Sequence, residues 1–275
     1  MRMLVSVRDV AEAQEALRAG VDFIDLKEPA AGALGGLALP VIREVVAALR
    51  AGNAEQDVGG AHGPMISATI GDLPPDAIEL ILERARAVGA CGVDLVKVGV
   101  PGRGAAACAV LEALAALPLA IVPVLIADDG LDAAVIDAAC TPAFAAVMAD
   151  TQAKRAGSLL ELLGADVLAA FIDRAHAAGR MVGLAGALRL ADLPQLARLG
   201  PDFAGFRSAV CDGSRAGRLD PGRLEALRAA VAIRGQARAH GQGATGRLEA
   251  LRAAIAMTPT AAPVPIRSAA DALAP

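Results

Sequence analysis

The chain has 275 residues, and 26 basic against 30 acidic side chains give it a formal net charge of -4. This charge balance argues against a polyanionic partner, and a chain with no Trp, no Tyr and only five Phe lacks the stacking side chains of single-strand binding proteins. We therefore expect no nucleic-acid partner.

The apolar residues are not arranged as a membrane helix. The longest late run without a charge, 113–127, has 15 residues and is interrupted by Pro118 and Pro123, whereas a membrane helix takes about 20 apolar residues. Charges from Arg8 onward leave no room for an apolar signal core at the start. We expect a soluble, cytoplasmic protein without a membrane partner.

The metal-binding residue types are scattered along the chain. No two cysteines form a CxxC pair, and no histidine has a second histidine or a carboxylate at the spacing of a metal site on one helix. The residues concerned are Cys91, Cys108, Cys140, Cys211, His62, His176 and His240. We expect no metal and no other cofactor.

Short apolar or β-branched runs alternate with longer amphipathic stretches, which is typical of parallel strands joined by helices. Eight strands are predicted: Met3–Val7, Phe23–Lys27, Met65–Gly71, Leu95–Val100, Ala120–Ala127, Ala145–Thr151, Met181–Ala187 and Phe203–Val210. Helices are predicted at Val10–Arg18, Pro40–Arg50, Pro75–Val88, Ala105–Leu117, Asp132–Ala139, Leu159–Ala178 and Leu190–Arg198. Eight such units favour an α/β fold with a single (β/α)₈ TIM barrel over an open doubly wound sheet.

The barrel domain is predicted to span residues 1–234, followed by a C-terminal extension over 235–275. GRLEALRAAVAI, beginning at Gly222, recurs as GRLEALRAAIAM from Gly246, and ten of the twelve positions are identical. The first copy is expected to close the barrel. The second is either a neutral duplication or a helix that packs on a neighbouring subunit, and the Pro- and Ala-rich tail after Met257 is expected to be flexible or to lie on the surface.

Lysine is rare in this chain, since only Lys27, Lys97 and Lys154 are lysine among the 26 basic residues. Arginine serves a solvated surface equally well, but only lysine can supply a neutral amine. The three lysines follow or lie in predicted strands two, four and six, which can bring them together at the catalytic rim of a barrel.

Two aspartates share this predicted site. Asp25 lies two residues before Lys27 and therefore points to the same face of its strand, and Asp150 is predicted to project inward. A helix cap or a salt bridge to arginine is the alternative role for each.

A lysine that is desolvated, or placed near other cations, has a lowered pKa and can attack a carbonyl to form a Schiff base. This is the chemistry of a metal-free class I aldolase. A second lysine or a carboxylate can then take a proton from the adjacent carbon.

Glycines follow the last two predicted strands, in GLAGAL and GFRSAVCDGSRAGRLD. In barrels of this kind, backbone amides after strands seven and eight commonly hold a phosphate. We predict that Gly186, Ala187, Arg207 and Ser208 bind a substrate phosphate, with tight turns and helix caps as the alternative explanation.

The chain resembles the (5-formylfuran-3-yl)methyl phosphate synthase family over most of the barrel. The motifs are LVSVRDVAEAQEALRAGVDFIDLKEP, SATIGDLP, DLVKVGV, MADTQAK and GLAGALRLADLPQLARLGPDFAGFRSAVCDG. The resemblance implies a (β/α)₈ lyase that condenses two glyceraldehyde-3-phosphate molecules, with loss of one phosphate and water, to a phosphorylated furan aldehyde. That product serves methanofuran-type cofactors of one-carbon metabolism.

Residue by residue, the resemblance makes Lys27 the Schiff-base lysine and Lys97 the general acid/base, with Asp25, Asp150 and Lys154 in support. The departures are Glu28 after the key lysine, the longer stretch 53–63 and the duplicated tail. Two alternatives stay open: another metal-free aldolase acting on triose or pentose phosphates, and a non-catalytic barrel that binds phosphorylated metabolites. We expect a phosphorylated triose as the small-molecule partner, and a homo-oligomer.

Overall fold

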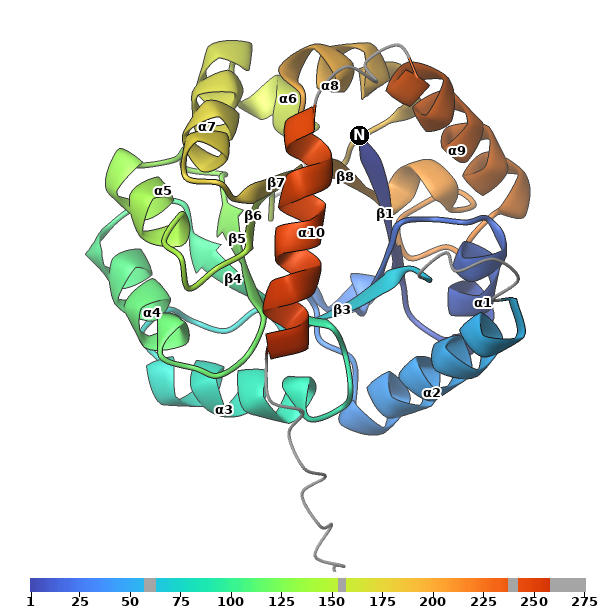
Figure 1. Ribbon diagram of the computed structural model, residues 1–275, viewed down its shortest axis with the longest axis horizontal. Helices are drawn as coiled ribbons and strands as arrows, with labels where there is room; N and C mark the ends of the chain where they lie inside the picture. Colours follow the sequence, from blue (N-terminus) through green and yellow to red (C-terminus); the bar gives the residue numbers. More distant parts are fainter. Residues whose placement is uncertain (57–62, 153–156, 237–241, 258–275) are drawn as a thin grey trace, which may run out of the picture.

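A computed structural model describes residues 1–56, 63–152, 157–236 and 242–257 (Figure 1). Eight parallel strands close into a barrel in which each strand pairs with the next along the chain and β8 pairs with β1. The strands are β1 (Arg2–Val7), β2 (Phe23–Leu26), β3 (Met65–Thr69), β4 (Leu95–Pro101), β5 (Ile121–Ile126), β6 (Ala146–Asp150), β7 (Met181–Leu184) and β8 (Phe203–Phe206). The predicted (β/α)₈ fold is confirmed, and the last two strands end earlier than expected.

Helices surround the barrel: α1 (Val10–Arg18), α2 (Leu39–Gln56), α3 (Ile78–Gly89), α4 (Ala105–Ala115), α5 (Ala133–Ala139), α6 (Leu159–Leu162), α7 (Ala165–Ala177), α8 (Leu193–Leu199) and α9 (Pro221–Gln236). Short 3₁₀ turns lie at Pro29–Ala31, Leu190–Asp192 and Ser208–Val210. The single helix predicted over 159–178 is wrong: Leu163 is extended and Gly164 begins a second helix.

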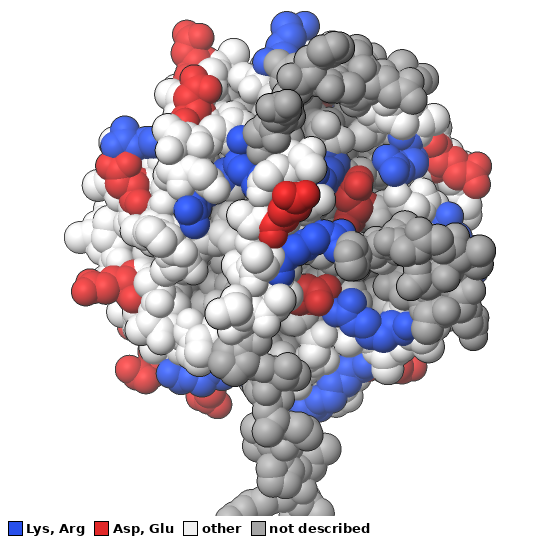
Figure 2. Space-filling view, in the orientation of Figure 1, with Lys and Arg blue, Asp and Glu red and all other residues white. Residues whose placement is uncertain are grey.

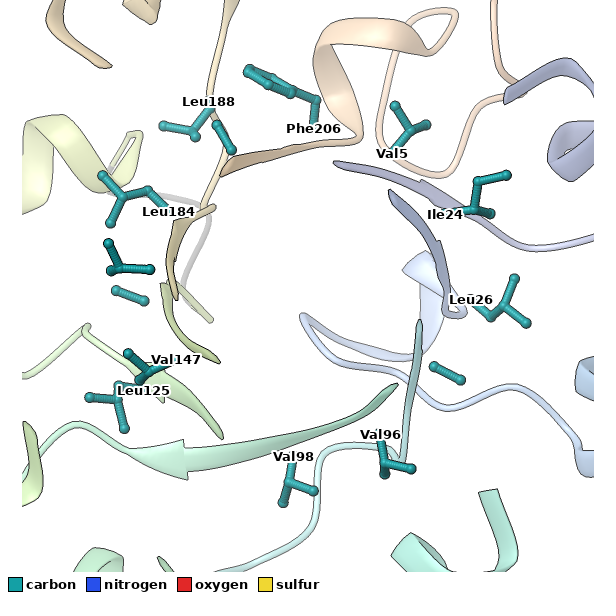
Figure 3. Close-up of a cluster of buried hydrophobic side chains, with 14 of the residues drawn as sticks. Val5, Ile24, Leu26, Val96, Val98, Leu125, Val147, Leu184, Leu188 and Phe206 are labelled. Carbon is teal, nitrogen blue, oxygen red and sulfur yellow. The ribbon is translucent and has the colours of Figure 1, made fainter. Parts of the chain in front are cut away.

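Alternation along the strands separates two layers of side chains. Figure 3 shows Ile24 and Leu26 of β2, with Val96 and Val98 of β4, pointing away from the barrel axis toward the helices. The residues between them therefore point inward, which brings Asp25 and Lys97 into the barrel.

The second copy of the duplicated sequence forms α10 (Gln242–Met257), which lies across the end of the barrel where the strands begin (Figure 1). Leu251 of α10 is 1% exposed and belongs to the inner apolar cluster, against which Leu248 and Ile255 also pack. Other members of this cluster come from the first residues of the strands, among them Phe23 and Phe203, whose ring centroids are 5.0 Å apart. The helix thus packs on its own barrel and closes its amino-terminal end.

Acidic and basic side chains are interspersed over the described part of this face (Figure 2). Within the described ranges, the helices lack the length and apolar character that a membrane crossing requires.

Candidate active site

A cavity opens at the carboxyl ends of the strands and collects residues from several loops. It is lined by Leu4, Ser6, Lys27, Ala33, Lys97, Asp150, Ala185, Gly186, Ala187, Leu188, Gly205, Phe206, Arg207, Ser208 and Arg215. Its empty space, open mouth included, is about 530 Å³. The structure thus brings together Lys27, Lys97, Asp150 and all four residues predicted to hold a phosphate.

Asp25 lies completely buried below this cavity and organises the inner layer. Its Oδ2 accepts a hydrogen bond from Lys97 Nζ at 3.0 Å and one from Ser6 Oγ at 3.3 Å, and its Oδ1 accepts from Ser67 Oγ at 2.7 Å. Burial alone would raise the pKa of this carboxyl, but the charges of Lys97 and Lys27, together with the hydrogen bonds from Ser67 and Lys97, outweigh burial and hold the pKa below its ordinary value. Asp25 is therefore a carboxylate that fixes Lys97 in place.

The backbone register explains how Asp25 acquires these partners. Ser6 of β1 and Ser67 of β3 are the residues paired with Asp25 on either side. We did not predict either serine as a site residue. The available signal was a serine inside each of the largely apolar runs MLVSV and MISAT.

Lys27 follows β2 directly and is 9% exposed. Its Nζ donates to the carbonyl oxygen of Ala33 at 3.3 Å. Burial lowers the pKa of this amine below its ordinary value, although the charges of Asp150 and Asp25 oppose the effect. The burial of Lys27 thus makes its neutral, nucleophilic form more accessible than in a solvated lysine.

Asp150 ends β6 and is 5% exposed. Its Oδ1 accepts a hydrogen bond from the amide of Thr151 at 2.7 Å. Burial raises the pKa of this carboxyl, with Lys27 and Lys97 acting in the opposite direction. Asp150 can therefore hold a proton close to the amine. The predicted site residue Lys154 lies outside the described residues.

The predicted phosphate residues line the cavity on the side of β7 and β8. Gly186 and Ala187 both have positive φ, 106° and 48°, and Ala187 is the one non-glycine residue with positive φ in the described part of the chain. Such a conformation costs energy for a side chain larger than hydrogen and often marks a functional loop. Within the described residues, the backbone amides of Gly186, Ala187 and Ser208 donate no hydrogen bond.

Arg207 lines the cavity but is held by the protein. Its guanidinium donates to both carboxylate oxygens of Glu12, to Ser6 O at 2.9 Å, to Gly217 O at 2.7 Å and, from Nε, to Arg215 O at 2.8 Å. These bonds use all five of its N–H groups. In this structure Arg207 fixes the loop after β8, a role that differs from the predicted phosphate contact.

The described residues contain no group of three or more His, Cys, Asp or Glu side chains that could hold a metal ion. The site described above contains lysine amines and aspartate carboxylates. A parallel eight-stranded barrel that gathers two lysines and two carboxylates toward the carboxyl ends of its strands belongs to the class of (β/α)₈ barrels, whose active sites lie at that rim.

Comparison with known proteins supports the barrel fold and shows the family to which the chain belongs. Phosphoribosyl anthranilate isomerase from Thermus thermophilus shares the fold with a TM-score of 0.56 and 18% identity over 85% of this chain and 99% of its own. The sequence model of the 4-HFC-P synthase family matches residues 3–228.

Relatives with the corresponding name cover most of the chain. The (5-formylfuran-3-yl)methyl phosphate synthase of Methanocaldococcus jannaschii is 31% identical, over 83% of this chain and 98% of its own. A Methylorubrum extorquens protein that bears this name provisionally is 40% identical, over 83% of this chain and 92% of its own. The chain belongs to the 4-HFC-P synthase family and is an enzyme, which confirms the resemblance seen in its motifs.

Proposed function

We propose that this protein is a (5-formylfuran-3-yl)methyl phosphate synthase that condenses two molecules of glyceraldehyde-3-phosphate through an imine on Lys27. The observation that carries this proposal is the buried Lys27 amine, with its lowered pKa, beside Asp150 and the Asp25–Lys97 pair. The relatives named above support the product, a phosphorylated furan aldehyde for methanofuran-type cofactors.

The first step needs a neutral amine and a nearby proton. Lys27 Nζ adds to the aldehyde carbon of one triose phosphate, and the resulting carbinolamine loses water to give an iminium. Asp150 lines the same cavity and has a raised pKa, so it supplies the proton that turns the leaving hydroxyl into water.

The second step needs a base above the inner layer. Lys97 Nζ, held by Asp25 at 3.0 Å, takes the proton from the carbon next to the iminium, and the C–H electron pair forms the C=C bond of the enamine. The enamine attacks the aldehyde carbon of a second triose phosphate. Hydrolysis of the imine returns the amine and frees the aldehyde, and ring closure with loss of water and of one phosphate then gives the aromatic furan.

The phosphate of the substrate would lie against Gly186, Ala187 and Ser208, which line the cavity. This placement puts the reacting aldehyde toward Lys27. In this proposal Arg207 positions the loop after β8, and a contact of Lys154 with phosphate or developing negative charge stays a prediction.

Borohydride reduction in the presence of glyceraldehyde-3-phosphate tests the proposal directly. The expected result is a covalent adduct on Lys27, located by peptide mass mapping, together with a product that absorbs in the near ultraviolet. Lys27→Arg keeps the positive charge and is expected to abolish both while leaving the fold intact by circular dichroism. An active Lys27→Arg variant would overturn the imine, and an adduct that leads only to a sugar phosphate would indicate an aldolase.

A further inference from the structure

Four cationic side chains line the cavity within the described part of the chain, and three of them have tasks. Lys27 is the proposed nucleophile, Lys97 pairs with Asp25, and Arg207 has all its N–H groups on protein acceptors. The fourth is Arg215, for which we predicted no role. Its guanidinium donates one hydrogen bond, from Nη2 to the carbonyl oxygen of Gly32. Most of its donors stay available.

The backbone around Arg215 is held firmly. Arg207 donates to the carbonyl oxygens of Arg215 and Gly217, and Arg8 donates to that of Ala216 at 2.8 Å. Three successive carbonyl groups are thereby anchored to the barrel. The backbone of this loop is therefore fixed, and Arg215 itself lines the cavity.

The setting of Arg215 suits a charged ligand. Its side chain is half-buried, and a guanidinium stays charged in proteins. Burial lowers its pKa, while Asp150, Asp72 and Glu28 act in the opposite direction without making an ion pair with it. A partly desolvated guanidinium with unused N–H donors can bind two oxygens of a phosphate through parallel hydrogen bonds, and its positive charge offsets part of the phosphate charge.

We propose that Arg215 is the side-chain ligand for the phosphate of the substrate that reacts at Lys27, and that it makes the enzyme select phosphorylated aldehydes. It lines the same cavity as Gly186, Ala187 and Ser208, so one anion can contact the guanidinium and these backbone amides together. The selection of substrate rests on the proposed function, whereas the anion site stands on the cavity alone.

The experiment compares the rate of borohydride trapping at Lys27 with glyceraldehyde-3-phosphate and with unphosphorylated glyceraldehyde, both below saturation. Arg215→Ala is expected to slow trapping of the phosphorylated aldehyde about 10- to 100-fold, the loss of one to two charged hydrogen bonds. Trapping of glyceraldehyde should keep its rate. Arg215→Lys should recover part of the preference, and Arg218→Ala, an exposed arginine three residues away, should behave as wild type.

Calorimetric titration with inorganic phosphate gives a readout that needs no reaction. Phosphate should bind the wild type and Arg218→Ala alike, and bind Arg215→Ala more weakly by a similar factor. The inference is overturned if Arg215→Ala binds phosphate as tightly as the wild type, or slows both aldehydes equally. A wild type that binds phosphate through Arg215 but forms no adduct on Lys27 would instead overturn the proposed function.

Discussion

Asp25 and Asp150 are both buried in the barrel, yet their environments push their pKa values in opposite directions. Asp25 accepts three hydrogen bonds from side chains, one of them from Lys97, and its pKa is lowered although burial opposes this. Asp150 accepts one backbone hydrogen bond, and burial raises its pKa. One carboxylate therefore stays ionised to fix a base, and the other can exchange a proton, a division of roles that is typical of catalytic pairs.

This division predicts the pH dependence of imine formation. The acid limb of the trapping rate should follow Lys27, because only the neutral amine attacks, and it should lie below the ordinary lysine pKa of about 10.4. The charge of Asp150 raises the pKa of Lys27, so Asp150→Asn should lower that pKa and move the acid limb to lower pH. The variant should also lower the maximal rate, because it cannot donate the proton that releases water.

The measurement is the rate of borohydride trapping across the neutral and alkaline range. Asp212→Asn, which neutralises an exposed carboxylate in the loop after β8, is the matched control and should leave the limb where it is. A limb that moves to higher pH in Asp150→Asn would contradict the proposed electrostatic coupling.

How far the site could be predicted depends on the distance between partners along the chain. The inward layer of Asp25, Lys97 and Asp150 was predictable, since strand alternation assigns each residue to a face. The hydrogen bonds that bind Arg207 to the protein were not predictable, because Glu12 lies 195 residues away in the sequence and contacts Arg207 only after the barrel closes. Local sequence patterns predict the face to which a side chain points. Its hydrogen-bond partners depend on contacts between distant parts of the chain, which form only when the barrel closes.

At the scale of elements, the two copies of the duplicated helix use the same apolar positions on different surfaces. Leu224, Leu227 and Val231 of α9 pack in the layer between strands and helices. Their counterparts 24 residues later, Leu248, Leu251 and Ile255, pack against the inner cluster at the end of the barrel. An apolar stripe with helical spacing therefore predicts that a helix packs, and leaves open which surface receives it.

The position of α10 predicts a large contribution of Leu251 to stability. This side chain borders a small apolar space that Lys97 also lines from above, so it is part of the floor beneath the inner layer. Leu251→Ala should lower the free energy of unfolding by about 2 to 4 kcal/mol, through lost burial and the cavity it leaves. Urea denaturation at neutral pH measures this effect.

Met257 offers a control in the same helix, since its side chain is 84% exposed. Met257→Ala should change the free energy of unfolding by no more than about 0.5 kcal/mol. Equal effects of the two substitutions would show that α10 does not pack on the barrel in solution.

At the scale of the whole molecule, the site and the closing helix lie at opposite ends of the barrel. Asp202 connects several elements at the end where the strands begin. It precedes β8, accepts a hydrogen bond from the amide of Val182 on β7 at 2.9 Å and contacts His176 Nε2 of α7 at 2.9 Å. Arg247 of α10 donates to its carboxylate at 2.8 Å from Nη2. One buried carboxylate thus joins a strand, two helices and the loop before β8.

These partners predict how the stability of the molecule depends on pH. Burial would raise the pKa of Asp202, but His176, Arg247 and the Val182 amide outweigh burial and hold it below its ordinary value of 3.8. A lowered pKa in the folded state means that the stabilisation is complete above 3.8 and is lost as the pH falls through the folded value. Asp202→Asn should therefore cost about 3 kcal/mol at neutral pH, the usual cost of removing one partner from a buried ion pair.

The difference in unfolding free energy between the wild type and Asp202→Asn isolates this carboxylate from the others that titrate in acid. Urea denaturation at neutral pH and at several values below 3.8 should show that difference shrinking as the solution becomes more acidic. Arg247→Ala removes the partner from α10 and should reproduce part of the loss at neutral pH, because His176 and the Val182 amide remain. A difference that is constant with pH would mean that Asp202 stabilises the barrel by its shape and not by its charge.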